Sequence, residues 1–141
     1  MDLHNRIIIT TESNLNKLFI FSVIVCFMFS CSNEYSEFAY SVEAAIKDVK
    51  TENNSIAFLD VRSLEEHYGE LGHLPGSTLI PQAELGDRIS DLSFFESKKV
   101  IVYSNKNERS IMSMLLLREN GFEAFYLNGG MSLVKEKFPN F

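Results

Sequence analysis

Cysteine is nearly absent from this chain. The 141-residue sequence contains two cysteines, Cys26 and Cys31, and both lie within its first 31 residues. The remainder of the chain therefore has no disulfide, no thiolate metal site and no cysteine nucleophile. We expect neither a metal nor a cofactor.

Basic residues are also few. Thirteen lysines and arginines face nineteen aspartates and glutamates, which gives a net charge of −6 at pH 7. Nucleic-acid binding needs a basic face, so the composition argues against a nucleic-acid partner. The 45% hydrophobic and 23% charged residues are ordinary for a globular protein and exclude both disorder and a polytopic membrane protein. The length predicts one domain.

The longest apolar run is LFIFSVIVCFMFS, residues 18–30, and it follows Lys17. This run is shorter than the roughly 20 residues that a membrane-spanning helix needs. It is typical of the hydrophobic region of a secretory signal peptide. The run ends in MFSC, which resembles a bacterial lipobox, the site at which a cysteine is acylated and becomes the new N-terminus. Cys31 is the predicted lipidation site.

We therefore predict three parts. Residues 1–31 form a signal peptide, residues 32–39 a short tether, and residues 40–141 the folded domain. The alternative is an uncleaved anchor helix over the same apolar run. Both interpretations place the domain outside the cytoplasmic membrane, and the first predicts a lipoprotein at the periplasmic face or in the outer membrane, with the membrane as a partner through lipidated Cys31.

From Tyr40 onward, strand patterns and helix patterns alternate. Short apolar runs without polar alternation predict strands covered on both faces, at residues 55–61, 78–80, 99–103 and 122–127. Apolar spacing and capping residues predict helices at residues 42–49, from 64, 85–92, 110–120 and 132–137. Such alternation predicts an α/β fold with a mostly parallel sheet and helices on both faces.

The candidate site is the polar loop SNKNER, residues 104–109, between a predicted strand and a predicted helix. Ligands of open α/β sheets bind beyond the carboxyl ends of strands. The N–H groups and dipole of the following helix favour an anion there, Arg109 can add a forked donor, and Ser110 can cap the helix. Most such loops are only connections, so from spacing alone both interpretations stay open. Asp60 and Arg62, at the end of another strand, are more typical of residues that order neighbouring loops.

Other polar and apolar side chains have ordinary interpretations. Glu65 and Glu66 mark the start of a helix with a solvated face. Met112, Met114 and residues 115–117 are predicted to face the core from the helix after the loop.

Five stretches, in this order and spacing, resemble a rhodanese-like domain: FLDVRSLEEH, GHLPGS, SNKNERS, LLLRENGF and YLNGG. The resemblance covers residues 40–141 and implies an α/β domain around a five-stranded parallel sheet. Active members of this family carry sulfane sulfur as a persulfide on a cysteine that opens a six-residue loop. Carried over by position, that cysteine falls on Ser104, and the loop comprises Ser104, Asn105, Lys106, Asn107, Glu108 and Arg109.

A serine does not perform the family's chemistry. Persulfide formation needs a polarizable thiolate, whereas a serine acts as a nucleophile only beside a positioned base. The candidate bases are His67, interpreted as a surface residue, and His73, interpreted as part of a turn. Glu108 also adds negative charge beside the proposed anion site.

The sequence thus predicts a catalytically inactive sulfurtransferase homologue that serves as a binding or scaffold module for a protein partner. One alternative is a sulfurtransferase-related or hydrolytic enzyme that uses the loop at residues 104–109. A second is a sensor of an anion such as thiosulfate, sulfate or phosphate. A third is that Ser104 is an engineered or misread cysteine.

Overall fold

The structure is a computed structural model that describes residues 34–141. The predicted signal peptide and Cys31 lie outside these residues. The sheet and its helices belong to one compact unit, Glu37–Phe141. Within the described part of the chain, no helix is both long and apolar enough to cross a membrane.

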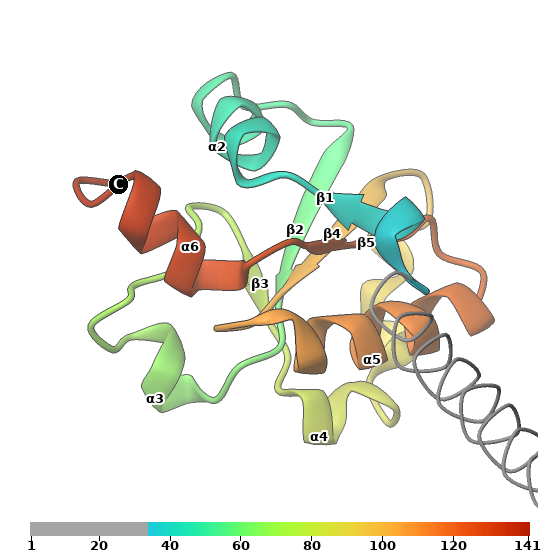
Figure 1. Ribbon diagram of the computed structural model, residues 1–141. Coiled ribbons are helices and arrows are strands. Elements are labelled where there is room, and N and C mark those ends of the chain that lie inside the picture. Colours follow the sequence, from blue (N-terminus) through green and yellow to red (C-terminus); the bar gives the residue numbers. More distant parts are fainter. Residues whose placement is uncertain (1–33) are drawn as a thin grey trace, which may run out of the picture. The chain divides into compact units, whose positions relative to one another are not determined.

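A five-stranded parallel sheet forms the centre of this unit, as predicted (Figure 1). Its strands run in the order β1-β5-β4-β2-β3 and all pairs are parallel. Their bounds are β1 Ala39–Tyr40, β2 Ile56–Asp60, β3 Thr78–Leu79, β4 Lys99–Tyr103 and β5 Ala124–Leu127. The central strands β2 and β4 are buried on both faces, which explains their continuous apolar sequences.

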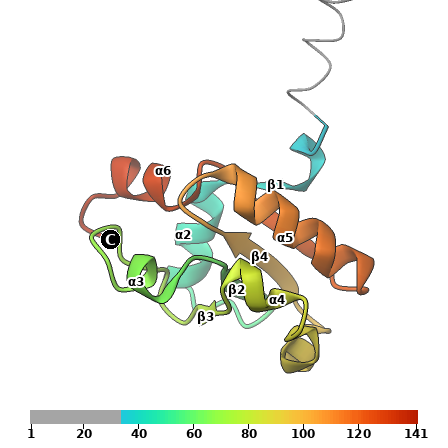
Figure 2. The same cartoon turned by 90° about the horizontal axis from the view of Figure 1, so that it is seen from below.

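Helices cover both faces of the sheet, which confirms the predicted α/β class. The helices α2 (Val42–Lys50) and α6 (Gly130–Lys137) contact each other on one face. On the other face, α5 (Asn107–Glu119) packs on β4 and β5 and contacts α4 (Gln82–Leu85). Figure 2 shows α4 and α5 in front of the sheet. The short α3 (Leu64–His67) follows β2.

The apolar spacing predicted for α2 is confirmed. Val42, Ala45 and Ile46 are buried against Phe58 and the other members of one core cluster. The predicted cap is also present, because the Ser41 hydroxyl accepts a hydrogen bond from the Ala44 N–H at 3.2 Å.

The prediction of one continuous helix over residues 85–92 is wrong. The helix α4 ends at Leu85, and a separate 3-10 helix, η2, spans Ile89–Phe95. Gly86 follows α4 directly, and glycine favours ending a helix because its backbone loses much conformational freedom there. Leu85 and Leu92 are both buried, so the apolar spacing identified core residues correctly.

The strand β1 was missed, because two residues carry no periodicity. It pairs with β5 at the sheet edge and follows the 3-10 helix η1, Ser36–Phe38. Cations alternate with aromatic rings beside it: Arg118 lies 4.1 Å from the Phe38 ring, and Lys99 lies 4.8 Å from the Phe125 ring. Such contacts hold a short edge strand that has few ladder hydrogen bonds.

The last helix begins at Gly130, two residues before the predicted start. Its first turn packs against the candidate loop, since the Met131 N–H donates to the Ser104 carbonyl at 2.9 Å. A Cβ on Gly130 would come within 2.7 Å of the Asn105 carbonyl oxygen, and the φ of Gly130 is +58°. Only glycine allows this close approach.

Substituting Gly130 tests this packing. Gly72 has a similar φ of +63°, but a Cβ added there would meet nothing within 4 Å, so Gly72→Ala measures the backbone cost alone, about 1–2 kcal/mol. We expect Gly130→Ala to lower the free energy of unfolding by roughly 1–3 kcal/mol more, because of overpacking. Urea denaturation of both variants measures the difference, and equal losses would contradict the close approach.

Candidate functional site

The candidate site lies where the carboxyl ends of three parallel strands meet at one edge of the sheet. Asp60 and Arg62 come at the end of β2, the loop at residues 104–109 follows β4, and Asn128 follows β5. The parallel register places Asp60 opposite Tyr103, the residue before the loop. The predicted site residues of the folded domain are therefore brought together.

Ser104 opens the loop and is buried, with 1% of its surface exposed. Its hydroxyl donates a hydrogen bond to the Lys106 carbonyl at 2.5 Å. In contrast, the peptide N–H groups of residues 105–109 have no acceptor among the described residues. These five free N–H groups, two in the loop and three in the first turn of α5, suit an anion.

The predicted start of the helix after the loop, at Ser110, is wrong. The helix α5 begins at Asn107, and Ser110 lies inside its first turn, where its hydroxyl donates to the Asn107 carbonyl at 2.9 Å. The Asn107 side chain fixes this start. Its Oδ1 accepts from the Gly129 N–H at 2.7 Å and its Nδ2 donates to Asn128 Oδ1 at 3.1 Å. Contacts with the turn after β5 thus replace the predicted serine cap.

A buried ion pair connects the loops around the site. The side chains of Asp60 and Arg62 are fully buried, and Arg62 donates to both carboxylate oxygens of Asp60, from Nε at 2.9 Å and Nη2 at 2.7 Å. The guanidinium also donates to Asn105 Oδ1 at 3.1 Å and to the Gly72 carbonyl at 2.7 Å. Arg62 therefore joins the segment after β2, the turn before β3 and the candidate loop.

The prediction that His67 lies at the surface is wrong. The residue is 5% exposed, and its Nδ1 lies 2.8 Å from Asp60 Oδ2. Its ring stacks on the ring of His73 with centroids 3.8 Å apart. Neither histidine forms a hydrogen bond with Ser104 in the described part of the chain. Sequence reasoning missed this burial because a four-residue helix shows no periodicity.

The prediction that Glu66 has a solvated face is also wrong in part. Ser63 and Glu66 form the predicted capping box at the start of α3. The same carboxylate accepts from Arg109 Nη1 at 2.7 Å and Nη2 at 2.6 Å, and from Asn105 Nδ2 at 2.7 Å. These donors come from a loop 39 and 43 residues away in sequence, which local patterns do not reveal.

The contact between Glu66 and Arg109 shifts the pKa values of both side chains. The hydrogen bonds from Arg109 lower the pKa of Glu66 to about 2, and the Glu66 carboxylate in turn raises the pKa of Arg109. The fork of Arg109 is thus occupied by a carboxylate of the protein itself. The predicted direct contact between Arg109 and an external anion would require this pair to open.

The remaining side chains around the loop point outward or into the core. Lys106 and Glu108 are exposed. Met112 is 61% exposed, so the prediction that it faces the core is wrong, whereas Met114 and Leu117 are buried as predicted.

Residues 34–141 contain no cluster of three or more histidine, cysteine, aspartate or glutamate side chains able to hold a metal ion.

Comparisons with known proteins agree with this architecture. Residues 41–137 match the model of the rhodanese-like domain family. The chain is 30% identical over 79 residues to "Putative sulfur carrier protein YrkF" of Bacillus subtilis (strain 168), and this match covers 56% of the chain and 40% of that protein. The chain therefore spans less than half the length of that relative.

Solved structures show the same fold. A rhodanese-like domain from Anabaena sp. has a TM-score of 0.62 and 25% identity, covering 72% of this chain and 75% of that domain. A rhodanese-related protein from Thermoplasma volcanium has a TM-score of 0.62 and 23% identity, covering 71% and 92% of the two chains.

The Glu66–Arg109 pair predicts a pH dependence of stability. The folded-state pKa of Glu66, about 2, lies below the ordinary value of 4.5, so its contribution is fully present above about pH 4.5 and is lost as the pH falls toward 2. We expect the free energy of unfolding of Glu66→Gln to fall less than that of the wild type as the pH is lowered from 4.5 to 2.

Urea denaturation at several pH values measures this profile. Glu65→Gln is the matched control, since Glu65 is the exposed neighbour on the same helix. An acid profile of Glu66→Gln that equals that of the wild type would show that the pair does not stabilise the fold.

Proposed function

The chain belongs to the rhodanese-like domain family, related to sulfur carrier and sulfurtransferase-type proteins, and we propose that it is a homologue without sulfur-transfer activity that acts as a binding module. Ser104 takes the position of the family's cysteine in this proposal. The observation that carries it is the hydroxyl of Ser104, which donates to the Lys106 carbonyl at 2.5 Å and forms no hydrogen bond with a histidine or a carboxylate among the described residues.

The chemistry of oxygen supports this proposal. A thiol has a pKa near 8.5, which nearby N–H groups and cations lower further, whereas a serine hydroxyl needs a base to remove its proton. The buried His67 directs its Nδ1 to Asp60. A hydrolytic function for Ser104 would therefore lack the proton acceptor that it requires.

The proposed ligand of the module follows from the hydrogen-bond donors of the loop that have no partner among the described residues. The N–H groups of residues 105–109 suit a small anion such as thiosulfate or sulfate. Glu66 already neutralises Arg109, and Glu108 is exposed nearby in sequence, so an anion would be held mainly by the backbone and by Lys106. Weak, salt-sensitive binding follows from this arrangement.

A protein partner would find apolar side chains on α3. Leu64 is 61% exposed and Tyr68, directly after the helix, is 73% exposed. Each lies two residues from Glu66 in sequence, and the Glu66 carboxylate accepts from Arg109 and Asn105 of the loop. Exposed apolar side chains beside a ligand loop favour a docking role for this region.

A second candidate function is an enzyme that uses the loop at residues 104–109. The free N–H groups favour it, because a cradle of this kind stabilises negative charge that develops during a reaction. The nucleophile would then be a group other than the Ser104 hydroxyl, or it would be the Ser104 hydroxyl activated by a base that a partner brings in.

Location is part of the proposal. The predicted lipidation of Cys31 would hold the domain at the periplasmic face or in the outer membrane, since two or more acyl chains anchor stably where one does not. The folded domain begins within ten residues of this cysteine in our division of the chain, so it would stay close to the membrane surface.

Restoring the thiol tests the loss of activity. We expect the wild-type protein to transfer no sulfur from thiosulfate to cyanide above the uncatalysed rate. Ser104→Cys should gain activity, because the free N–H groups of the loop lower the pKa of a thiol and hold a persulfide. A colorimetric thiocyanate assay on purified protein measures both.

Ser104→Ala is the matched control for this assay. It removes the hydroxyl without adding sulfur and should be as inactive as the wild type. Sulfur transfer by the wild type that Ser104→Ala abolishes would overturn the proposal and favour the enzyme.

Cysteine substitutions test the anchor. Cells grown with a radiolabelled fatty acid should label the wild-type chain and Cys26→Ala, but not Cys31→Ala, because only Cys31 follows the lipobox-like sequence. Label that survives in Cys31→Ala, or a wild-type chain without label, would contradict lipidation at this position.

A further inference from the structure

The sequence contains two asparagine–glycine pairs, Asn120–Gly121 and Asn128–Gly129. Asparagine is chemically labile, and most so before glycine, because glycine has no side chain to hinder the attack of its peptide nitrogen on the asparagine amide. The side chains of Asn120 and Asn128 are both exposed, so water reaches each of them. The two pairs therefore have the same local chemistry and differ only in the contacts that the fold gives them.

Deamidation of such a pair needs no reactant other than water. The glycine peptide nitrogen loses its proton and attacks the side-chain carbonyl carbon of the asparagine. A carbon–nitrogen bond forms, and the side-chain nitrogen leaves with that proton as ammonia. Water then opens the cyclic imide at either carbonyl group. The product is an ordinary aspartate, or an aspartate whose main chain runs through the side chain and is longer by its methylene group.

The Asn107 side chain holds both reacting groups of the second pair. Its Oδ1 accepts from the Gly129 N–H at 2.7 Å, and its Nδ2 donates to Asn128 Oδ1 at 3.1 Å. The first hydrogen bond stabilises the protonated peptide nitrogen, which is not the attacking form. The second restrains the carbonyl group that would be attacked. The reaction therefore requires both hydrogen bonds to open.

The hydrogen bonds at the first pair are local instead. Asn120 Nδ2 donates to the Leu116 carbonyl at 2.8 Å, and the Gly121 N–H donates to the Arg118 carbonyl at 3.0 Å. Both acceptors lie in the last turn of α5, and the ends of helices fray. These bonds open more readily than a contact between two distant segments, so Asn120 is an internal reference of the same sequence type.

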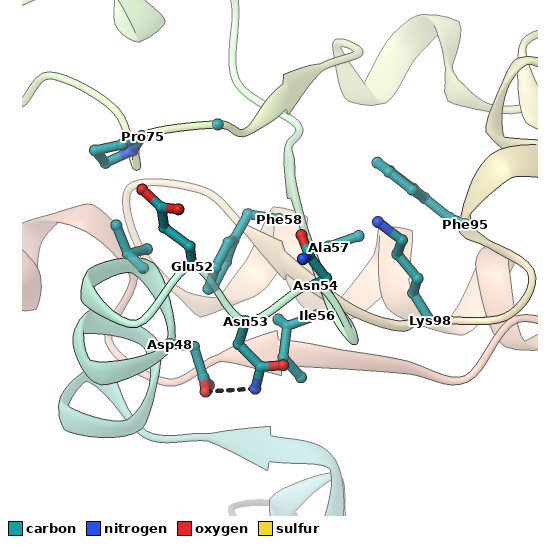
Figure 3. Close-up of a pocket in the computed structure, with 12 residues that line it drawn as sticks. Asp48, Glu52, Asn53, Asn54, Ile56, Ala57, Phe58, Pro75, Phe95 and Lys98 are labelled. Atoms are coloured by element: carbon teal, nitrogen blue, oxygen red, sulfur yellow. Dashed lines mark hydrogen bonds between the residues drawn. The ribbon is translucent and has the colours of Figure 1, made fainter.

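A related contact occurs at the opposite end of the sheet, where Asn53 and Asn54 line a cavity of about 390 Å³ (Figure 3). Asn53 Oδ1 accepts from the Ser55 N–H at 3.1 Å, which is the peptide group that would attack Asn54. Its Nδ2 donates to Asp48 at 2.9 Å, the dashed line in Figure 3. Within residues 34–141, an asparagine side chain thus restrains the peptide group after a second asparagine at two places.

The turn at residues 128–130 supports the candidate loop. The Met131 N–H, three residues after Asn128, donates to the Ser104 carbonyl at 2.9 Å. A main chain lengthened at residue 128 would displace this donor. Either product would also put a carboxylate in place of the neutral amide that Asn107 contacts at the start of α5. Deamidation of Asn128 would therefore alter the surroundings of the loop.

From these contacts we propose that the Asn128–Gly129 pair is a site of spontaneous deamidation and that the Asn107 side chain protects it. In the folded chain Asn107 keeps the glycine nitrogen protonated and the asparagine carbonyl in place. Once both hydrogen bonds open, the pair reacts like an unprotected asparagine–glycine sequence. This role is independent of the proposed function of the loop, since it requires neither a bound anion nor sulfur transfer.

The test compares both pairs within one peptide. Trypsin cleaves after Arg118 and Lys135, so residues 119–135 carry both pairs, and fragmentation in a mass spectrometer assigns the mass gain of deamidation to Asn120 or Asn128. The full chain in detergent micelles is incubated at mildly alkaline pH, either folded or in urea. We expect Asn128 to react roughly tenfold more slowly than Asn120 in the folded wild type, because two hydrogen bonds must open first. In urea the two rates should be similar.

Variants of Asn107 separate its side chain from the rest of the fold. Asn107→Ala should raise the rate at Asn128 in the folded chain by about tenfold and leave the rate at Asn120 unchanged. Asn107→Asp keeps an acceptor for the Gly129 N–H and should retain most of the protection. Glu108→Gln is the matched control, because Glu108 is the exposed next residue on α5, and it should react like the wild type. Rates are compared at a temperature at which circular dichroism shows every variant to be folded.

Three results would overturn the proposal. The first is a folded wild type that deamidates at Asn128 as fast as the chain in urea, a comparison that needs no variant. The second is an Asn107→Ala chain that deamidates at Asn128 no faster than the wild type. The third is a rise in Glu108→Gln as large as that in Asn107→Ala, which would assign the protection to the helix start in general.

Discussion

The buried ion pair between Asp60 and Arg62 is the interaction on which the candidate site depends. A buried charge is costly unless a partner and hydrogen bonds satisfy it, so the geometry of the pair admits little variation. Asp60 uses its carboxylate for Arg62 and His67, and the remaining donors of Arg62 reach Asn105 and the Gly72 carbonyl. One pair at the end of β2 thereby sets the positions of the surrounding loops, and a loss of either partner would release them together.

The Glu66–Arg109 pair determines what the loop can hold. Both terminal nitrogens of Arg109 and the Asn105 amide donate to one carboxylate, which leaves the peptide N–H groups of the loop and the exposed Lys106 side chain as the open donors. The N–H groups provide directed hydrogen bonds without a full positive charge. In the proposed function, a loop built in this way would hold an anion weakly and reversibly.

Features with local causes could be predicted from the sequence, and features with distant partners could not. The caps at Ser41 and Ser63, and the buried runs of β2 and β4, depend on residues within a few positions of each other. The burial of His67 and the pairing of Glu66 depend on segments brought together only by the sheet. The resemblance of the motifs placed the loop correctly beyond β4, but it did not indicate which donors of the loop are already occupied.

The absence of sulfur from the loop also affects its chemical durability. Oxidants convert an exposed thiolate to sulfenic and then to irreversible acids, whereas a hydroxyl does not undergo this series. Both cysteines of the chain precede residue 34. Among the described residues the sulfur atoms belong to methionines, of which Met114 and Met131 are buried and Met112 is exposed on α5. Peroxide would therefore modify the outside of this domain first, and the loop that opens at Ser104 would keep its shape and its charge in a harshly oxidising environment.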